Sequence, residues 1–303
     1  MADTHVRCFR PLSELNLIDN FLFHKMIDDP ETGEDFCRIL LRTILNREIR
    51  HIKITPQKDI YGIDTDMHGI RMDAYLEDIG GSDALDADIL PDIYDIEPNL
   101  TYEKESIPKR MRFYQGMIDS TNLRKGHTYK NLPNVVIIFI LPYDPFGDNR
   151  MVYTIQNTIK ENSDIDYNDG ALKIILYTKG KAGNASKELQ DMLKYFESST
   201  TANVTNPDIE FVHHMVDRLK ERKEMKLEYM KNCEWDEFNK NIGREEGIVL
   251  GREEARQEGI HNLISTCLKY KISCDNILTE LISTYSITQE EAQLYINKYS
   301  NLS

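Results

Sequence analysis

A run of seven consecutive apolar residues at Val135–Leu141 constrains the fold of this chain more than any other segment. Most of these residues are β-branched, and such residues favour an extended strand. The run is far shorter than the roughly 20 residues that a membrane-spanning helix needs. A strand that is apolar at every position must be covered on both faces, so we expect a central strand in a sheet that carries helices on both sides.

The segments around this strand alternate between helical and extended patterns. Apolar residues at helical spacing predict helices, and short alternating runs predict strands. In chain order we expect helices at 15–26 and 34–45, strands at 52–55, 68–77 and 92–97, a helix at 106–122, the strand at 134–141, and shorter strands at 151–156 and 171–178. The order helix, three strands, helix, strand predicts a compact α/β sandwich.

Beyond residue 185 the pattern becomes helical and strongly charged. Helices are expected at 187–197 and 208–231, and in residues 243–259 a glycine or alanine recurs at every fourth position. This repeat has two interpretations, a contact line in a close-packed helix pair or a solvated linker helix, and each helical glycine weakens a lone helix by up to about 1 kcal/mol. We therefore expect a first domain at 1–235 and a helical C-terminal region at 236–303, which would serve oligomerisation or regulation.

The composition is that of a water-soluble globular protein with an acidic balance. The 303 residues carry a net charge of −14, which argues against a protein that coats nucleic acid nonspecifically but is compatible with a local basic face. No apolar signal segment stands at the N-terminus, and the five cysteines are scattered without a CxxC spacing. We expect a cytoplasmic protein with reduced thiols and no association with membranes.

Two acidic residues, Asp73 and Glu97, lie in separate strand-like runs. A hairpin would bring their carboxylates close together, where like charges repel unless a hard divalent cation neutralises them. Because residues two apart share one face of a strand, Asp95, Glu97 and Asn99 point the same way. The pattern has two interpretations, the carboxylate centre of a metal-dependent nuclease or solvated residues on an exposed sheet face.

The segment that follows these strands is basic. Residues 103–130 carry a local excess of four positive charges, and the helix expected there presents Lys109, Arg110 and Arg112. These side chains could contact DNA phosphates, since neutralisation of the backbone drives affinity for DNA. A solvated helix face is the alternative. Gln115 lies on the same helix and could reach the carboxylates as a polar group.

Six short blocks occur in order along residues 12–235: Leu17–Phe23, Gly69–Asp73, Tyr94–Asn99, Pro108–Gln115, Asp144–Gly147 and Asn168–Lys173. In this order they resemble the successive motifs of the PD-(D/E)XK nuclease family transposases, which are the Rpn-type recombination-promoting nucleases of bacteria. The resemblance implies a restriction-endonuclease-like αβββαβ sandwich core with a helical C-terminal extension. It also implies a Mg²⁺-dependent DNA endonuclease that hydrolyses phosphodiester bonds in connection with recombination or mobile elements.

The resemblance assigns roles to individual residues. It implies that Mg²⁺, with Mn²⁺ as an alternative metal, is held by Asp73, Glu97, the carbonyl of Pro98 and Asp19. Asn99 stands where a lysine or glutamine is more usual, and because its amide carries no charge it would position a water or a phosphate oxygen.

The catalytic residues would accordingly be Asp73, Glu97, Asn99 and Gln115, with DNA as the substrate and a homodimer or higher homo-oligomer as the assembly. Asn20 and Asn99 depart from the family pattern. They leave open a second interpretation, a catalytically weakened DNA-binding or regulatory module with the same fold.

Overall fold

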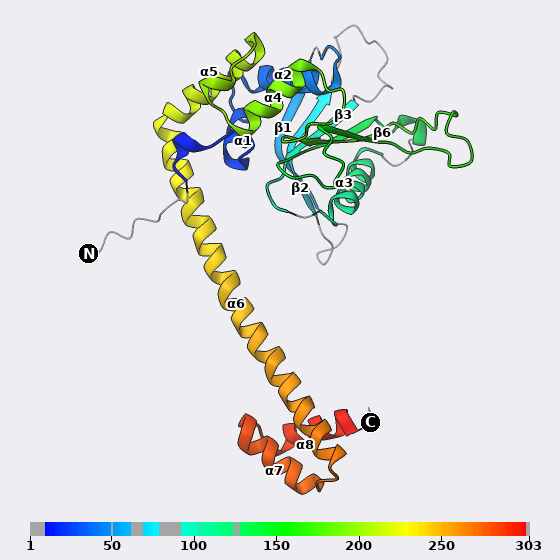
Figure 1. The fold of residues 1–303 in the computed structure, drawn as a ribbon, viewed down its shortest axis with the longest axis vertical. Coiled ribbons are helices and arrows are strands. Elements are labelled where there is room, and N and C mark those ends of the chain that lie inside the picture. Colours follow the sequence, from blue (N-terminus) through cyan, green and yellow to red (C-terminus); the bar gives the residue numbers. More distant parts are fainter. Residues whose placement is uncertain are drawn as a thin grey trace. The chain divides into compact units, whose positions relative to one another are not determined.

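The computed structural model describes residues 10–49, 51–61, 69–78, 92–102, 104–123, 126 and 128–300. The chain divides into two compact units, whose described residues lie within 10–229 and 230–300; the expected domain boundary at residue 235 stays a prediction. Each unit is described by itself (Figure 1).

A six-stranded mixed sheet forms the centre of the first unit. Its strands are β1 (Ile52–Ile60), β2 (Ile70–Asp78), β3 (Asp92–Pro98), β4 (Val135–Leu141), β5 (Val152–Ile155) and β6 (Ala171–Tyr177). They lie in the order β1-β2-β3-β4-β6-β5. The pairs β1–β2, β2–β3 and β5–β6 are antiparallel, whereas β3–β4 and β4–β6 are parallel. The parallel β3–β4 pair requires a crossover, which the helix between them supplies.

Helices cover both faces of the sheet (Figure 1). They are α1 (Asn20–Ile27), α2 (Gly33–Leu45), α3 (Ile107–Asn122), α4 (Lys187–Glu197) and α5 (Pro207–Glu221), with short 3₁₀ turns at Leu12–Glu14, Tyr129–Asn131 and Thr201–Asn203. Every residue of β4 is buried, and alternate side chains enter two apolar cores. Ile138 packs with residues of α1, α2, α4 and α5, whereas Ile137 packs with α3. The expected α/β fold with a central strand at 134–141 is confirmed.

Local chemistry explains where several helices begin. Ser186 and Asn206 cap α4 and α5 by accepting the amide protons of Leu189 and Ile209. The helix expected from Leu15 begins only at Asn20, because residues 12–14 form a 3₁₀ turn and the Asp19 carboxylate accepts the Asn16 amide proton. The helix expected at 208–231 is broken at Arg222, whose backbone is extended.

In the second unit a long helix is followed by two short ones. The long helix is α6 (Lys223–Lys269), and α7 (Cys274–Tyr285) and α8 (Gln289–Ser300) follow it. Apolar residues of the three helices form a separate core at Ile260, Ile264, Ile277, Leu281, Ile287, Ala292 and Ile296.

The small residues of α6 fall into two groups. A Cβ atom added at Gly259 would meet the hydroxyl of Tyr285 at 2.6 Å, so this position serves packing within the unit. At Gly243, Gly247 and Gly251 such an atom would meet nothing within 4 Å. The repeat is therefore helical, and its first three glycines lie on an open helix surface.

None of the described helices is both long and apolar enough to cross a membrane. Cys37, Cys267 and Cys274 are free thiols, as expected. Cys233 is disulfide-bonded, so the expectation that all the thiols are reduced is wrong for this residue.

Candidate functional site

The strands β2 and β3 bring three carboxylates together. Their register pairs Ala74 with Ile96 and Tyr75 with Asp95, which places Asp73 beside Glu97 one position further along. The backbone amide of Asp73 donates a hydrogen bond of 2.7 Å to Oε1 of Glu97. The strand alternation also puts Asp95 on the face that carries Glu97. The two acids that the sequence singles out are therefore neighbours, and Asp95 joins them.

Burial makes the charged forms of two of these carboxylates unfavourable. Asp95 is fully buried and Glu97 is 2% exposed. Burial and the nearby charge of Asp73 raise the pKa of Asp95 well above its usual range. Burial and the charges of Asp95 and Asp73 do the same to the pKa of Glu97. Neither carboxylate oxygen of Asp95 accepts a hydrogen bond from an N–H or O–H donor in the described part of the chain, and the group that faces Asp95 is the carboxyl of Glu97. A proton shared with Glu97 or a cation would relieve this repulsion.

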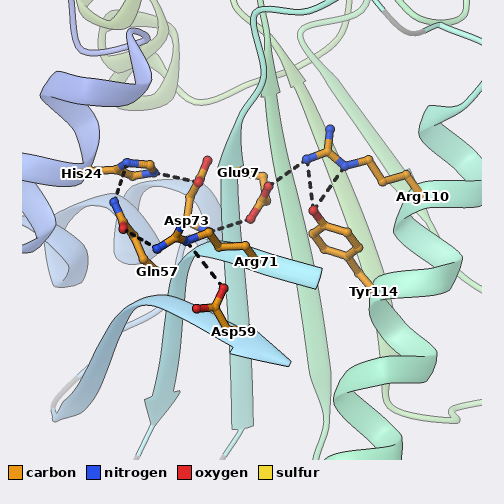
Figure 2. A network of polar contacts seen from close by, with 8 residues as sticks. All are labelled: His24, Gln57, Asp59, Arg71, Asp73, Glu97, Arg110 and Tyr114. Atoms are coloured by element: carbon orange, nitrogen blue, oxygen red, sulfur yellow. Dashed lines mark hydrogen bonds and ion pairs between the residues drawn. The ribbon is translucent and has the colours of Figure 1, made fainter. Parts of the chain in front are cut away.

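Helix α3 supplies a positive charge to the cluster. Arg110 donates a hydrogen bond of 3.2 Å to Oε2 of Glu97. Its guanidinium also donates to the hydroxyl of Tyr114, at 3.1 and 3.3 Å, and lies 5.3 Å from the ring centroid of Phe139. These contacts aim Arg110 at the sheet (Figure 2). Arg110 was expected to contact DNA phosphates, and in this structure its guanidinium faces a carboxylate of the protein.

Helix α1 contributes a histidine on the other side of the cluster. Nε2 of His24 lies 2.7 Å from Oδ1 of Asp73, and Nδ1 of His24 lies 3.1 Å from Nε2 of Gln57. The Oε1 atom of Gln57 accepts a hydrogen bond of 3.1 Å from Arg71, and Nε of Arg71 lies 3.6 Å from Oδ1 of Asp59. A continuous chain of polar contacts thus runs from Asp59 to Tyr114 (Figure 2).

Gln57 adopts an unusual backbone conformation at this point. Its φ is +46°, and of the described residues with positive φ that are not glycine it is the one that lies inside a strand. A conformation of this kind costs on the order of 1–3 kcal/mol in a residue other than glycine, and such strain is concentrated at functional sites. The kink turns the Gln57 side chain toward His24.

The other predicted site residues make separate contacts. Asp19 forms an ion pair with Arg10, and its carboxylate accepts a hydrogen bond from the backbone amide of Asn16. Asn99 is buried, its Oδ1 accepts the Thr101 amide proton at 2.9 Å, and its Nδ2 has no partner among the described residues. The side-chain amide of Gln115 donates to Asp119 at 3.1 and 3.2 Å.

The remaining three residues lie on β3 and α3. Pro98 ends β3 beside Ile140 of β4. Lys109 and Arg112 are exposed on α3. Within the described ranges of the chain, no hydrogen bond or ion pair joins Asp19, Asn99 or Gln115 to Asp73 or Glu97.

Sequence reasoning missed His24 and Gln57 as members of the site. Each comes from an element distant in the sequence from Asp73, and neither stands in a pattern that marks it. Asp95 was placed on the face of Glu97 but was not included among the site residues. Its spacing of two from Glu97 was the available signal, since a strand aligns such residues.

The donor set suits a hard cation, because carboxylate oxygens are the ligands that Mg²⁺ prefers. Among the described residues, no N–H or O–H donor faces the buried Asp95 oxygens, which favours either such a cation or a proton shared with Glu97. In the described part of the chain, however, no three His, Cys, Asp or Glu side chains converge on one metal position. Asp73 is held by His24 and Glu97 by Arg110, so a metal ion would have to replace one of these contacts.

Comparison of the chain with protein-family models, with curated proteins and with solved structures finds no match.

Proposed function

We propose that the protein is a Mg²⁺-dependent DNA endonuclease with a restriction-endonuclease-like core. One observation carries the proposal: Asp73 and Glu97 lie side by side on adjacent strands, with the buried Asp95 on the same face as Glu97, in a fold whose core runs helix, three strands, helix, strand. Buried acids in such proximity are costly unless a cation or a proton neutralises them.

Asp73 and Glu97, with the carbonyl of Pro98, would hold the metal ion. When bound, Mg²⁺ or Mn²⁺ lowers the pKa of a coordinated water and stabilises the charge that develops on the scissile phosphate. A bound divalent cation would favour the charged form of the neighbouring Asp95, which burial otherwise disfavours. Asp19 is the weaker candidate ligand, because its carboxylate already binds Arg10 and the Asn16 amide.

Helix α3 would contact the DNA. Lys109 and Arg112 are exposed and can reach phosphate oxygens from solvent. Arg110 donates a hydrogen bond to Glu97. When Glu97 binds a metal ion instead, the guanidinium of Arg110 would be released and could bind a phosphate of the DNA. Asn99 and Gln115 would orient water or phosphate through their amides.

A second candidate function is a DNA-binding or regulatory module without cleavage activity. Two observations favour it: Asn99 carries no charge where a lysine or glutamine is more usual in the family that the chain resembles, and Arg110 already occupies one oxygen of Glu97. Such a module would bind DNA through α3 without any requirement for metal.

Cleavage of supercoiled plasmid DNA in Mg²⁺, Mn²⁺ or EDTA separates the two candidates. We expect nicking by the wild type with either metal, loss of nicking in EDTA, and a loss of at least 100-fold in Asp73→Asn and in Glu97→Gln. Glu77→Gln is the matched control, since it removes a carboxylate from β2 that pairs with Lys53 outside the cluster. Wild-type binding of DNA without metal-dependent nicking would support the module and reject the nuclease.

We further propose that the protein acts in the bacterial cytoplasm as a homodimer that presents one site to each DNA strand. The open glycines of α6 and the nearby exposed Trp235 and Phe238 support self-association. Sedimentation of the full chain across a range of concentrations tests the dimer, and a constant monomer mass would reject it.

A further inference from the structure

The contacts around His24 define which of its nitrogens carries the proton. Arg71 can only donate hydrogen bonds, so the Gln57 atom that faces it at 3.1 Å must be the carbonyl oxygen. The amide nitrogen of Gln57 then faces Nδ1 of His24 and donates to it. Nδ1 is therefore the acceptor, and Nε2 carries the hydrogen that is donated to Oδ1 of Asp73.

We propose that His24 is a positioning residue for the metal-binding carboxylate of Asp73, and that Gln57 and Arg71 hold its ring with Nδ1 as the acceptor and Nε2 as the donor to Asp73. This role rests on the proposed nuclease function. The hydrogen bond from Nε2 of His24 fixes the position of Oδ1 of Asp73. Oδ2 accepts no hydrogen bond from the described residues and is left for a cation.

Two further observations support a built arrangement. Gln57 keeps its side chain toward His24 at the cost of a left-handed backbone inside β1, and such a conformation persists only where its surroundings hold it. Asp59 faces Arg71 from the same strand as Gln57, so the guanidinium that orients Gln57 is itself anchored. Partners of this kind, one contact removed from a metal, orient the ligand and increase its affinity.

The first test examines the tautomer and needs neither metal nor DNA. We expect ¹⁵N-edited spectra of the histidine rings at pH 8, assigned by comparison with His24→Gln, to show His24 with the proton on Nε2 alone. Gln57→Glu keeps the size of the side chain and replaces the donor to Nδ1 with an acceptor, so the variant should carry a proton on Nδ1. A wild-type ring with its proton on Nδ1 would overturn the proposal.

The second test measures the binding of Mg²⁺ and Mn²⁺ to the full chain by titration calorimetry. His24→Leu should weaken binding by about 10- to 100-fold, the range seen when such supporting partners of metal ligands are removed. His24→Gln should restore most of the affinity, because the introduced amide can donate to Asp73 and accept from Gln57. Gln57→Glu should weaken binding without removing a group that touches Asp73.

The outcomes separate this proposal from the nuclease assignment. Equal affinity in wild type and in folded His24→Leu would overturn the role of His24 while leaving the metal site intact. A wild type that binds neither ion would overturn the proposed function and, with it, the purpose of the arrangement. Circular dichroism of each variant confirms that a loss of affinity is not a loss of the fold.

Discussion

Asp95 makes the stability of the first unit depend on pH in an unusual direction. Burial and neighbouring charge raise the pKa values of Asp95 and Glu97 in the folded protein. A raised pKa means that the folded state binds a proton more tightly than the unfolded chain does. The stabilisation that comes from this tighter proton binding is fully present when the pH is below the pKa of these groups in the unfolded chain, near 4. It is lost as the pH rises through their pKa in the folded protein. We therefore expect the free energy of unfolding to fall as the pH is raised from about 5.

The magnitude follows from proton linkage. Each additional proton bound by the folded state changes the free energy of unfolding by about 1.4 kcal/mol per pH unit. Between pH 5.5 and 7.5 a single proton therefore accounts for up to about 3 kcal/mol, as long as the pH stays below the folded pKa. Asp95→Asn removes one titrating group and the repulsion that it exerts on Glu97. We expect the variant to be more stable than the wild type at pH 7.5, with a difference that shrinks toward pH 5.5.

Urea unfolding followed by far-ultraviolet circular dichroism at three pH values measures these slopes. Glu77→Gln is the control, because it removes one negative charge from β2 outside the carboxylate cluster and should keep the wild-type slope. Equal slopes for wild type and Asp95→Asn would refute the reasoning. So would a wild type whose stability increases between pH 5.5 and 7.5.

Three further substitutions test the packing and the helices. Asp29→Asn removes a buried carboxylate that forms ion pairs with Arg218 at 2.9 Å and with Arg222 at 2.7 Å. Because both arginines stay partly exposed, we expect urea unfolding to show a decrease of about 1–3 kcal/mol in the free energy of unfolding. Gly33→Ala would place a Cβ atom 2.3 Å from the carbonyl oxygen of Ile27, so the turn between α1 and α2 must shift and thermal unfolding should report a loss of about 1–3 kcal/mol. The Cβ atom that Gly247→Ala introduces meets no atom within 4 Å, so the variant should stabilise α6 by up to about 1 kcal/mol. Thermal unfolding followed by the helical circular dichroism signal should show a higher melting temperature. An unchanged or lower melting temperature would contradict an open position.

The sequence predicts the framework of the first unit well because its signals are local. The apolar run of β4 can only be buried, and the basic helix that follows β3 begins within one residue of its expected start. Strand β1 extends to Ile60, beyond the expected residue 55, since pairing with β2 stabilises residues whose own pattern is weak.

The candidate site is less accessible to sequence reasoning, because it is assembled from distant elements. Asp73 and Glu97 can be recognised, since each lies in a strand and the two strands are neighbours. His24 reaches Asp73 from a helix 49 positions earlier, and Gln57 depends on a backbone kink that its residue type disfavours. Asp19 was expected as a further metal ligand, but its position just before α1 directs its carboxylate to Arg10 and Asn16.

The guanidinium of Arg110 gives the site a resident counter-ion. Proteins whose metal ligands have no alternative partner often fold only when the metal is present. Here the positive charge that faces Glu97 belongs to a side chain of α3, so this carboxylate has a counter-ion within the protein itself. Under the proposed function, metal uptake would be an exchange of one cation for another at Glu97, and the measured affinity would be the difference between the two. Selectivity would arise from the same exchange, since an incoming ion would have to outcompete a guanidinium that Tyr114 and Phe139 hold in place.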